Sequence, residues 1–327
     1  MVGLEQACVR RPLRKRATAQ THTDARSTLL TCGAWRGHAL DSPGVGSALL
    51  RGNAAEGGDG NESIAGRVYV NGKRNELRVP EERSSLMTTF ATTLEAREEI
   101  AEGTMAFHLR KPSGFDFKPG QAIDVILTSS AGAPEDQSTR HTFSIVSAPF
   151  QDDLVIATRM RDSAYKRALK SMPVGSQVTI DGPSGSLGLH KDPARAAILI
   201  AGGIGITPFM SMLRQAAKDQ RQQRLILLYS NRRPEDAAFL SELQQLEGKN
   251  PNFRLLATMT EMPASHLPWA GQEGLVTAEL VANAVGDLSA PIFYVAGPPG
   301  MVEAMRQTLN RAGIDDDDIR SEEFYGY

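Results

Sequence analysis

The chain has 327 residues, of which 41% are hydrophobic and 23% are charged, and its formal net charge is −2. This length predicts two domains, or two domains with an appendage. The near-neutral charge gives no reason to expect a nucleic-acid partner. No window approaches the unbroken apolar stretch of roughly 20 residues that a membrane helix needs, so no membrane partner is expected.

The cysteine content limits the redox chemistry of the chain. Its two cysteines are Cys8 and Cys32. A disulfide framework is therefore not expected, and a reducing, cytoplasmic location fits. An iron–sulfur cluster normally takes about four cysteine ligands. Any such centre must therefore lie on another protein.

Residues 1–86 differ in composition from the rest. The segment opens with an arginine-rich stretch around residues 10–16, and residues 52–61 are rich in glycine and polar side chains. Because no apolar period persists, we expect an extension that is mostly disordered; an organelle transit peptide is the alternative. Residues 67–79 alternate around Asn71-Gly72, which predicts a hairpin. We expect translation to begin at or near Met87, since every other interpretable pattern follows it.

Residues 87–190 are predicted to form a closed antiparallel barrel of six strands. Short apolar or alternating runs are separated by glycines and prolines, which is typical of such barrels. The expected strands are Thr88–Ala96, Met105–Arg110, Ala122–Leu127, His141–Ser144, Leu154–Arg159 and Gln177–Asp181. A short helix is expected over Ser163–Lys170.

Residues 191–327 are predicted to form a parallel sheet covered by helices on both faces, because buried strands alternate with amphipathic helices. The expected strands are Ala196–Ala201, Arg224–Tyr229, Phe253–Ala257 and Ile292–Ala296. The expected helices are Pro208–Lys218, Glu235–Leu246, Thr277–Ala284 and Pro299–Ala312. Sheets of this kind bind ligands beyond the carboxyl ends of their strands, at the point where strand order reverses.

Two glycine-bearing loops follow strands of this sheet. In residues 202–208 (GGIGITP), glycines allow a pyrophosphate close to the backbone. There Thr207 is expected to cap the next helix and Pro208 to take its first position. Residues 297–300 (GPPG) have the same design. Helix N-termini favour phosphate, so both loops are expected to hold one ligand. The alternative for each is a tight turn without a ligand.

The barrel strand RHTFS, residues 140–144, carries a third motif. Arg140 offers a guanidinium fork for a pyrophosphate, Phe143 can stack on a planar ring, and Ser144 can hydrogen-bond a ring nitrogen. Alternation places Arg140, Thr142 and Ser144 on one face of the strand. The alternative is an edge strand with a salt-bridged arginine.

Together the three motifs resemble those of the ferredoxin–NADP reductase family, and the resemblance covers about residues 87–327. It implies an FAD-binding barrel over residues 87–190 and an NAD(P)-binding α/β domain over residues 191–327. It also implies that hydride passes from NADH or NADPH to FAD, and electrons then pass to an unidentified acceptor, such as an iron–sulfur or haem protein. Two alternatives stay open: a non-catalytic, redox-sensing flavoprotein subunit of the same fold, and a flavin-free nicotinamide dehydrogenase.

The resemblance implies the site residues as well. Flavin contacts are expected from Arg140, His141, Thr142, Phe143, Ser144, Thr158, Arg159, Met160, Ser163, Ala164 and Tyr165. Nicotinamide-dinucleotide contacts are expected from Gly203, Gly205, Thr207, Pro208, Ser230, Arg232, Gly297, Pro298, Pro299 and Met301. The expected catalytic residues are Ser144, near flavin N5, and Glu323, Phe324 and Tyr327 of the acidic-aromatic segment; either Phe324 or Tyr327 covers the flavin. No metal ligands are expected.

Two further points concern this nucleotide site. Ala296 replaces a cysteine of the family motif. Because that cysteine does not itself carry the hydride, we expect the reaction to be retained. Either Arg232 or Arg233 could reach a 2′-phosphate, but Ala257–Glu261 lacks the Ser-Arg pair of NADP-specific relatives. We therefore favour NADH over NADPH.

Overall fold

The computed structural model describes residues 69–70, 73–74, 88–127 and 139–325. The chain divides into two compact units, Met1–Arg78 and Val79–Tyr327. In the first, β1 (Tyr69–Val70) pairs antiparallel with β2 (Lys73–Arg74), as expected for the hairpin. The expectations for residues 1–68 and for Met87 lie outside the described residues. Among the helices that are described, none is long and apolar enough to cross a membrane.

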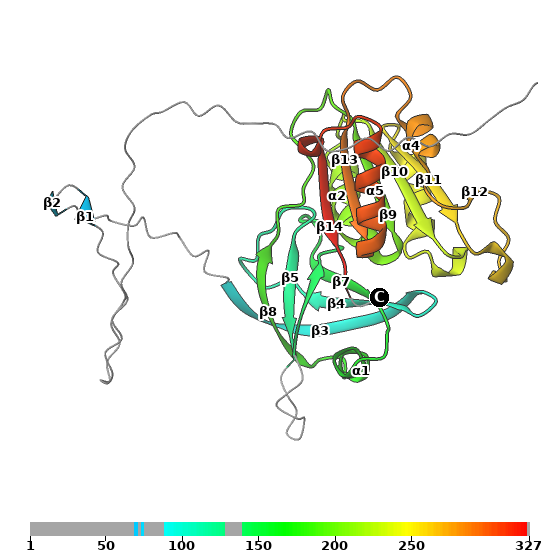
Figure 1. The fold of residues 1–327 in the computed structure, drawn as a ribbon. Coiled ribbons are helices and arrows are strands. Elements are labelled where there is room, and N and C mark those ends of the chain that lie inside the picture. The colour runs from blue at the N-terminus through cyan, green and yellow to red at the C-terminus, as the bar shows by residue number, and fades with distance from the viewer. Residues whose placement is uncertain (1–68, 71–72, 75–87, 128–138, 326–327) are drawn as a thin grey trace, which may run out of the picture. The chain divides into compact units, whose positions relative to one another are not determined.

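The second unit begins with the antiparallel barrel (Figure 1). Its strands are β3 (Thr88–Ala101), β4 (Thr104–Arg110), β5 (Ala122–Ile126), β6 (Arg140–Ser144), β7 (Asp153–Arg159) and β8 (Gln177–Ser184), in the order β6-β5-β8-β3-β4-β7. A bridge between Ile145 and Ile156 joins the two edges of this sheet, and the Val146 amide donates to the Val155 carbonyl at 2.8 Å. The predicted six-stranded fold is therefore confirmed.

Alternation along the strands fills the barrel. Leu94, Phe107, Ile123 and Ile156 are fully buried members of its interior cluster. Helix α1 (Ala164–Ser171) lies after β7, and its first turn is capped because the Lys166 amide donates to the Ser163 hydroxyl at 3.2 Å. A short polar side chain at this position satisfies an amide that the helix itself leaves unpaired.

The second half is a parallel sheet with the order β12-β11-β10-β9-β13-β14. Its strands are β9 (Ala197–Gly202), β10 (Leu225–Asn231), β11 (Phe253–Met259), β12 (Gln272–Glu273), β13 (Ile292–Gly297) and β14 (Ile319–Glu323). Its helices are α2 (Thr207–Lys218), α3 (Leu240–Lys249), α4 (Ala278–Val285) and α5 (Pro299–Arg311). The sheet and its four helices were predicted; the edge strands β12 and β14 were not.

One predicted helix boundary is wrong. The helix expected over Glu235–Leu246 is replaced by a short 3-10 turn at Pro234–Asp236 and by α3, which begins only at Leu240. Phe239 separates the two because its φ of 61° lies in the left-handed region, which a continuous right-handed helix cannot include.

Side chains of the central strands alternate between two apolar layers, which is why helices cover both faces (Figure 1). Leu199 and Leu227 pack in the layer that includes α2 and α3. Ile200 and Leu228 pack in the layer that includes α4 and α5.

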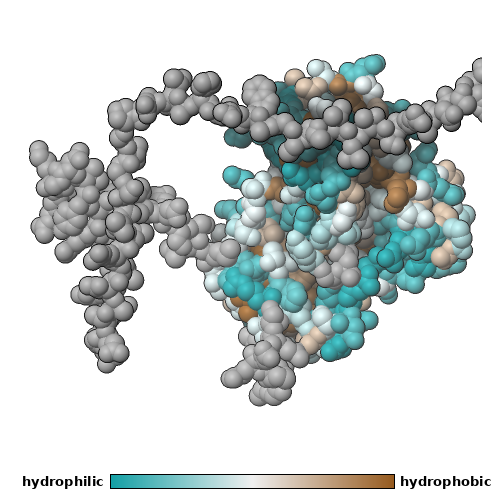
Figure 2. Space-filling view, in the orientation of Figure 1, coloured by the Kyte–Doolittle hydropathy of each residue, from teal (hydrophilic) through white to brown (hydrophobic). Residues whose placement is uncertain are grey.

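The barrel and the parallel sheet share a seam. The cluster under α2 continues into barrel residues, among them Val146 and Ala157. Two side chains of α2 bond to barrel carbonyls: Ser211 Oγ donates to Ser147 O at 2.7 Å, and Arg214 Nη1 donates to Val146 O at 3.0 Å. On the face drawn in Figure 2, hydrophilic residues surround small hydrophobic areas.

Candidate functional site

The two glycine-bearing loops meet where strand order reverses. Strand β9 lies between β10 and β13, so the loop after β9 adjoins the loop after β13. A Cβ on Gly205 would lie 2.3 Å from the Ala296 carbonyl oxygen, so only glycine permits this approach. Gly203 has a φ of +53° and nothing within 4 Å of an added Cβ, which leaves open space beside the backbone.

The expected role of Thr207 as a helix cap is wrong. The N-cap of α2 is Ile206, and no side chain caps it. The Thr207 hydroxyl instead donates backwards to the Ile204 carbonyl at 3.0 Å, because a 3-10 turn over Gly203–Ile206 runs directly into the helix. Pro208, predicted to take the first position of the helix, is the second residue of α2 and lies in its first turn.

A pocket opens between the barrel and this loop. It is lined by His141, Thr142, Phe143, Ser144, Ala157, Thr158, Arg159, Lys166, Ile204, Thr207, Phe324 and Tyr325. The residues therefore come from β6, β7, α1, the loop after β9 and the segment after β14. Eight of them were expected as site residues, and Lys166 belongs to the turn after Ser163 that the resemblance assigns to the flavin phosphate; Ala157, Ile204 and Tyr325 were not expected.

Ser144 is the expected polar group of this pocket. Among the described residues, its buried hydroxyl has no hydrogen-bond partner in normal geometry. A buried hydroxyl without a partner costs free energy unless a ligand or water satisfies it. Glu322 lies beside it: burial raises the pKa of this carboxyl, and the Ser144 hydroxyl lowers it to a lesser degree. A ligand atom in the pocket could satisfy the Ser144 hydroxyl.

His141 and Lys166 line the barrel side of the pocket, and Tyr165 packs behind His141. The His141 ring lies 4.1 Å from the Tyr165 ring, between centroids, and Tyr165 donates its hydroxyl to the Val125 carbonyl at 2.9 Å. Lys166 donates from Nζ to the Arg159 carbonyl at 2.8 Å. Burial lowers the pKa of His141, and the Lys166 charge lowers it further. A neutral imidazole is the consequence at physiological pH.

Arg140 lies outside the pocket lining and is held by two carboxylates. Its Nε lies 2.7 Å from Asp124 Oδ2, and its Nη2 lies 2.6 Å from Asp181 Oδ2. The Thr142 hydroxyl also donates to Asp124, so Arg140 and Thr142 share a strand face as predicted. Phe143 instead packs in the barrel interior. The guanidinium keeps an exposed edge, since 44% of the side chain is accessible.

Strand β14 places Glu322, rather than the expected Glu323, beside the pocket residue Ser144. Glu323 is exposed and accepts a hydrogen bond from the Tyr325 hydroxyl, whereas Glu322 lies beside Ser144. Phe324 lines the pocket, and its amide donates to the Gly297 carbonyl at 3.0 Å. Tyr327 lies outside the described residues. Register could have identified Glu322, because it pairs with Ala296 on β13.

The remaining expected contacts surround the pocket or lie farther along the sheet edge. The residues that do not line the pocket are Arg140, Met160, Ser163, Ala164, Tyr165, Gly203, Gly205, Pro208, Ser230, Arg232, Gly297, Pro298, Pro299, Met301 and Glu323. Met301 packs against the glycine turns, since its sulfur would lie 2.2 Å from a Cβ on Gly202. Arg232 and Glu261 follow β10 and β11 and form an exposed ion pair of 3.5 Å.

The fold and the pocket define a two-domain protein in which an antiparallel barrel is joined to a parallel nucleotide-binding sheet. Residues 199–307 match the family model described as "Oxidoreductase NAD-binding domain". The chain is similar to the glycine betaine monooxygenase reductase subunit of Chromohalobacter salexigens, with 29% identity over 222 residues, or 68% of this chain and 60% of that protein. It is also similar to the toluate 1,2-dioxygenase electron transfer component of Pseudomonas putida, with 28% identity over 69% of this chain and 65% of that protein.

Solved structures share the fold. The Amycolatopsis cytochrome P450 reductase GcoB aligns with a TM-score of 0.63 and 20% identity over 73% of this chain and 71% of that one. A ferredoxin NADP+ reductase from Neisseria gonorrhoeae with bound FAD and NADP aligns with a TM-score of 0.60 and 22% identity over 72% and 98% of the two chains. The matched NAD-binding domain, the sequence relatives and the shared fold support the ferredoxin–NADP reductase family for this chain. The chain spans only 60% to 65% of the length of the two sequence relatives named above.

Proposed function

We propose that this protein is an NAD(P)H-dependent flavin oxidoreductase that passes electrons to a separate acceptor. The observation that carries the proposal is the pocket itself, which is lined both by strands β6 and β7 of the barrel and by the glycine loop after β9. A pocket shared by two domains is a common place for cofactor chemistry. Oxygenase reductase components among the relatives support an iron–sulfur or haem protein as the acceptor.

The described residues fit FAD and a nicotinamide dinucleotide. The buried Ser144 hydroxyl makes no hydrogen bond of normal geometry among the described residues, although Glu322 lies beside it, and the Gly203 backbone borders open space, so each can meet a ligand. We assign residues 87–190 to the flavin, residues 191–327 to the dinucleotide, and residues 1–86 to an extension. A bound flavin supplies hydride acceptance and release of single electrons.

The chain's own residues position and shield these groups. The loop at Gly203–Thr207 and the GPPG turn would hold a dinucleotide at the carboxyl edge of the sheet. Ser144 offers a hydrogen bond at the pocket floor. Phe324 covers the pocket and excludes water, held by its backbone bond to Gly297. Hydride transfer needs the reacting atoms about 3–3.5 Å apart, so positioning dominates.

The test is anaerobic reduction. Purified protein should be yellow, and NADH should bleach it faster than NADPH does. Reoxidation should follow with ferricyanide and with an iron–sulfur or haem acceptor. A yellow protein that fails to oxidise either nucleotide would favour a redox-sensing subunit, and a colourless protein would favour a flavin-free dehydrogenase.

The Arg140→Ala variant should lose flavin, and full flavin occupancy in that variant would contradict the assignment of Arg140 to the flavin. We also propose a cytoplasmic location, which cell fractionation tests.

A further inference from the structure

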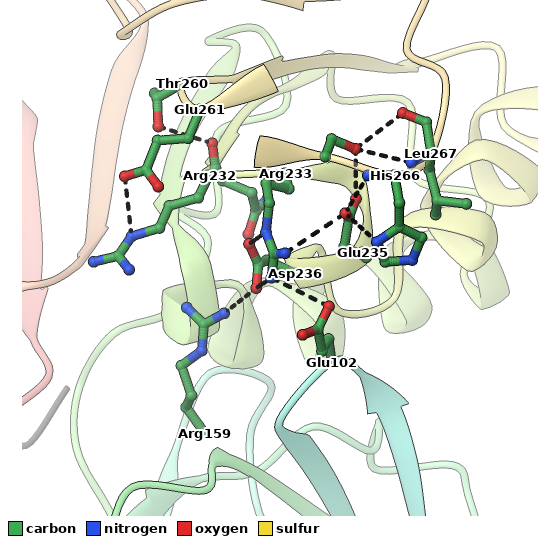
Figure 3. A network of polar contacts seen from close by, with 12 residues as sticks. Glu102, Arg159, Arg232, Arg233, Glu235, Asp236, Thr260, Glu261, His266 and Leu267 are labelled. Carbon is green, nitrogen blue, oxygen red and sulfur yellow. Dashed lines mark hydrogen bonds and ion pairs between the residues drawn. The ribbon is translucent and has the colours of Figure 1, made fainter. Parts of the chain in front are cut away.

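A network of charged side chains joins the barrel to the parallel sheet beside the pocket (Figure 3). We define the Asp236 network as Glu102 and Arg159 of the barrel together with Arg233, Glu235 and Asp236 of the segment after β10. Figure 3 shows Arg159 and Glu102 reaching this segment from two separate barrel elements. Glu102 lies in the turn between β3 and β4, and Arg159 is the last residue of β7. One short segment therefore holds two parts of the barrel.

Asp236 is the centre of the network. Its side chain is only 5% exposed. Arg159 Nη2 lies 2.6 Å from its Oδ1, and Arg233 donates from Nε to its Oδ2 at 2.8 Å and from Nη2 to its Oδ1 at 3.0 Å. Burial raises the pKa of the Asp236 carboxyl, but the Arg233 hydrogen bonds and the Arg159 charge outweigh burial and hold the pKa below its ordinary value. The carboxylate is thus charged and satisfied.

The other contacts complete the connection. Arg233 Nη2 lies 3.2 Å from Glu102 Oε2, and the Glu102 amide donates to the Glu235 carbonyl at 2.8 Å. The Glu235 carboxylate in turn accepts from the His266 amide at 3.0 Å, so the loop after β11 is joined as well. Glu102, Glu235 and His266 offer ligand atoms within 4.8 Å of one another. The Arg233 guanidinium already neutralises the carboxylates there, so a cation would have to displace it.

The location of the network gives it a role in the reaction. Arg159 lines the pocket, and its strand also supplies the pocket residues Ala157 and Thr158. Asp236 lies in the turn after β10, a strand of the sheet that also supplies the glycine loop on the opposite wall. Fixing Arg159 to Asp236 therefore fixes one wall of the pocket relative to the other. The α2 seam packs against Val155 and Ala157 of β7, but its side-chain hydrogen bonds reach only Val146 and Ser147. The Arg159–Asp236 contact therefore adds a polar tie at the end of β7 that the seam does not supply.

We propose that Asp236 is a positioning residue that sets the separation between hydride donor and hydride acceptor by tying β7 to the nucleotide-binding sheet. This inference rests on the proposed function. The inference goes beyond the proposed function because it assigns a role to Asp236, which is not among the residues that line the pocket. A misplacement of about 1 Å can cost roughly 100-fold in rate. Loss of the Asp236 charge should therefore reduce hydride transfer with far less effect on binding.

The experiment compares Asp236→Asn with wild-type protein and with Asp316→Asn, in which the lost carboxylate belongs to an exposed ion pair with Arg306. Rapid mixing with NADH without air gives the limiting rate of flavin reduction and the Kd for NADH. For Asp236→Asn we expect the limiting rate to fall tenfold or more and the Kd to change less than threefold. Asp236→Glu should recover part of the rate, and Asp316→Asn should match wild type.

A second measurement separates positioning from general damage. Protein reduced beforehand with dithionite and mixed with ferricyanide should reoxidise at the wild-type rate in Asp236→Asn, because that step needs no nicotinamide. A limiting rate within twofold of wild type, or a parallel loss of ferricyanide reoxidation, would overturn the proposal. If Asp236→Asn does not hold flavin, Glu102→Gln decides: we expect a twofold to fivefold slower reduction, and no change would overturn the proposal. Wild-type protein that lacks flavin or does not oxidise NAD(P)H would refute the proposed function instead.

Discussion

Gly205→Ala should disrupt the meeting of the two glycine-bearing loops. The new methyl carbon would lie 2.3 Å from the Ala296 oxygen, 2.5 Å from the Ala296 carbonyl carbon and 2.7 Å from Gly297 Cα. All three are backbone atoms, so the loops must separate. Overpacking of this kind costs about 1–3 kcal/mol. Since roughly 2–4 °C of Tm is lost per kcal/mol at this size, we expect the Tm to fall by about 2–12 °C.

Two other substitutions of the same type serve as controls. At Gly300 nothing lies within 4 Å of an added Cβ, and the residue lies in the first turn of α5, so Gly300→Ala should be neutral or stabilise by up to about 1 kcal/mol. At Gly203 there is also room, but the φ of +53° should make alanine cost about 1–2 kcal/mol. Thermal melting of the three variants tests this order of stability, and titration with NADH tests whether binding is affected. A Gly205→Ala protein with wild-type Tm and NADH Kd would refute the reasoning.

Three further outcomes follow from charges near the site. Asp181→Asn should tighten FAD binding roughly threefold to tenfold, because one of the two carboxylates that engage Arg140 loses its charge. Equilibrium dialysis measures the Kd for FAD. Unchanged or weaker binding would show that Asp181 does not compete with FAD for Arg140. Glu261→Arg should raise kcat/KM for NADPH relative to NADH, because Arg232 loses its ion-pair partner and a second cation is added for the 2′-phosphate. An unchanged ratio of the two kcat/KM values in steady-state assays would contradict this. Burial lowers the pKa of His190 in the folded state below the ordinary 6.5, so the unfolded chain binds the extra proton more readily and stability should decline as the pH falls below about 6.5. Between pH 7.5 and 5, the Tm of His190→Leu should therefore change less with pH than the wild-type Tm. An equal dependence of Tm on pH would exclude His190 as the cause.

The sequence predicted the central strands because their patterns are local. Buried runs such as Ile198–Ala201 lie between two helical layers, and glycines mark the ends of β9 and β13. The edge strand β14 escaped prediction because Ile319–Glu323 carries four polar or charged residues and follows an acidic run. An edge position leaves much of such a strand accessible to water, so its composition resembles that of a loop.

The candidate site was predictable only where a motif carried it. Glycines and the RHTFS strand identified both walls of the pocket. Asp236 gave no local indication of its role, since its partner Arg159 is 77 positions away and Pro234–Asp236 is typical of a helix start. Glu322 and Glu323 are adjacent acids in sequence, and only the register of β14 with β13 distinguishes them.

The apolar layer under α2 does not stop at the edge of the sheet. It runs on into Val146, Val155 and Ala157 of the barrel. Cutting the chain between the two halves would bare this layer on both fragments, so neither half is expected to remain monomeric alone. Calorimetry of the intact unit should then record one cooperative melting peak, with calorimetric and van't Hoff enthalpies in agreement.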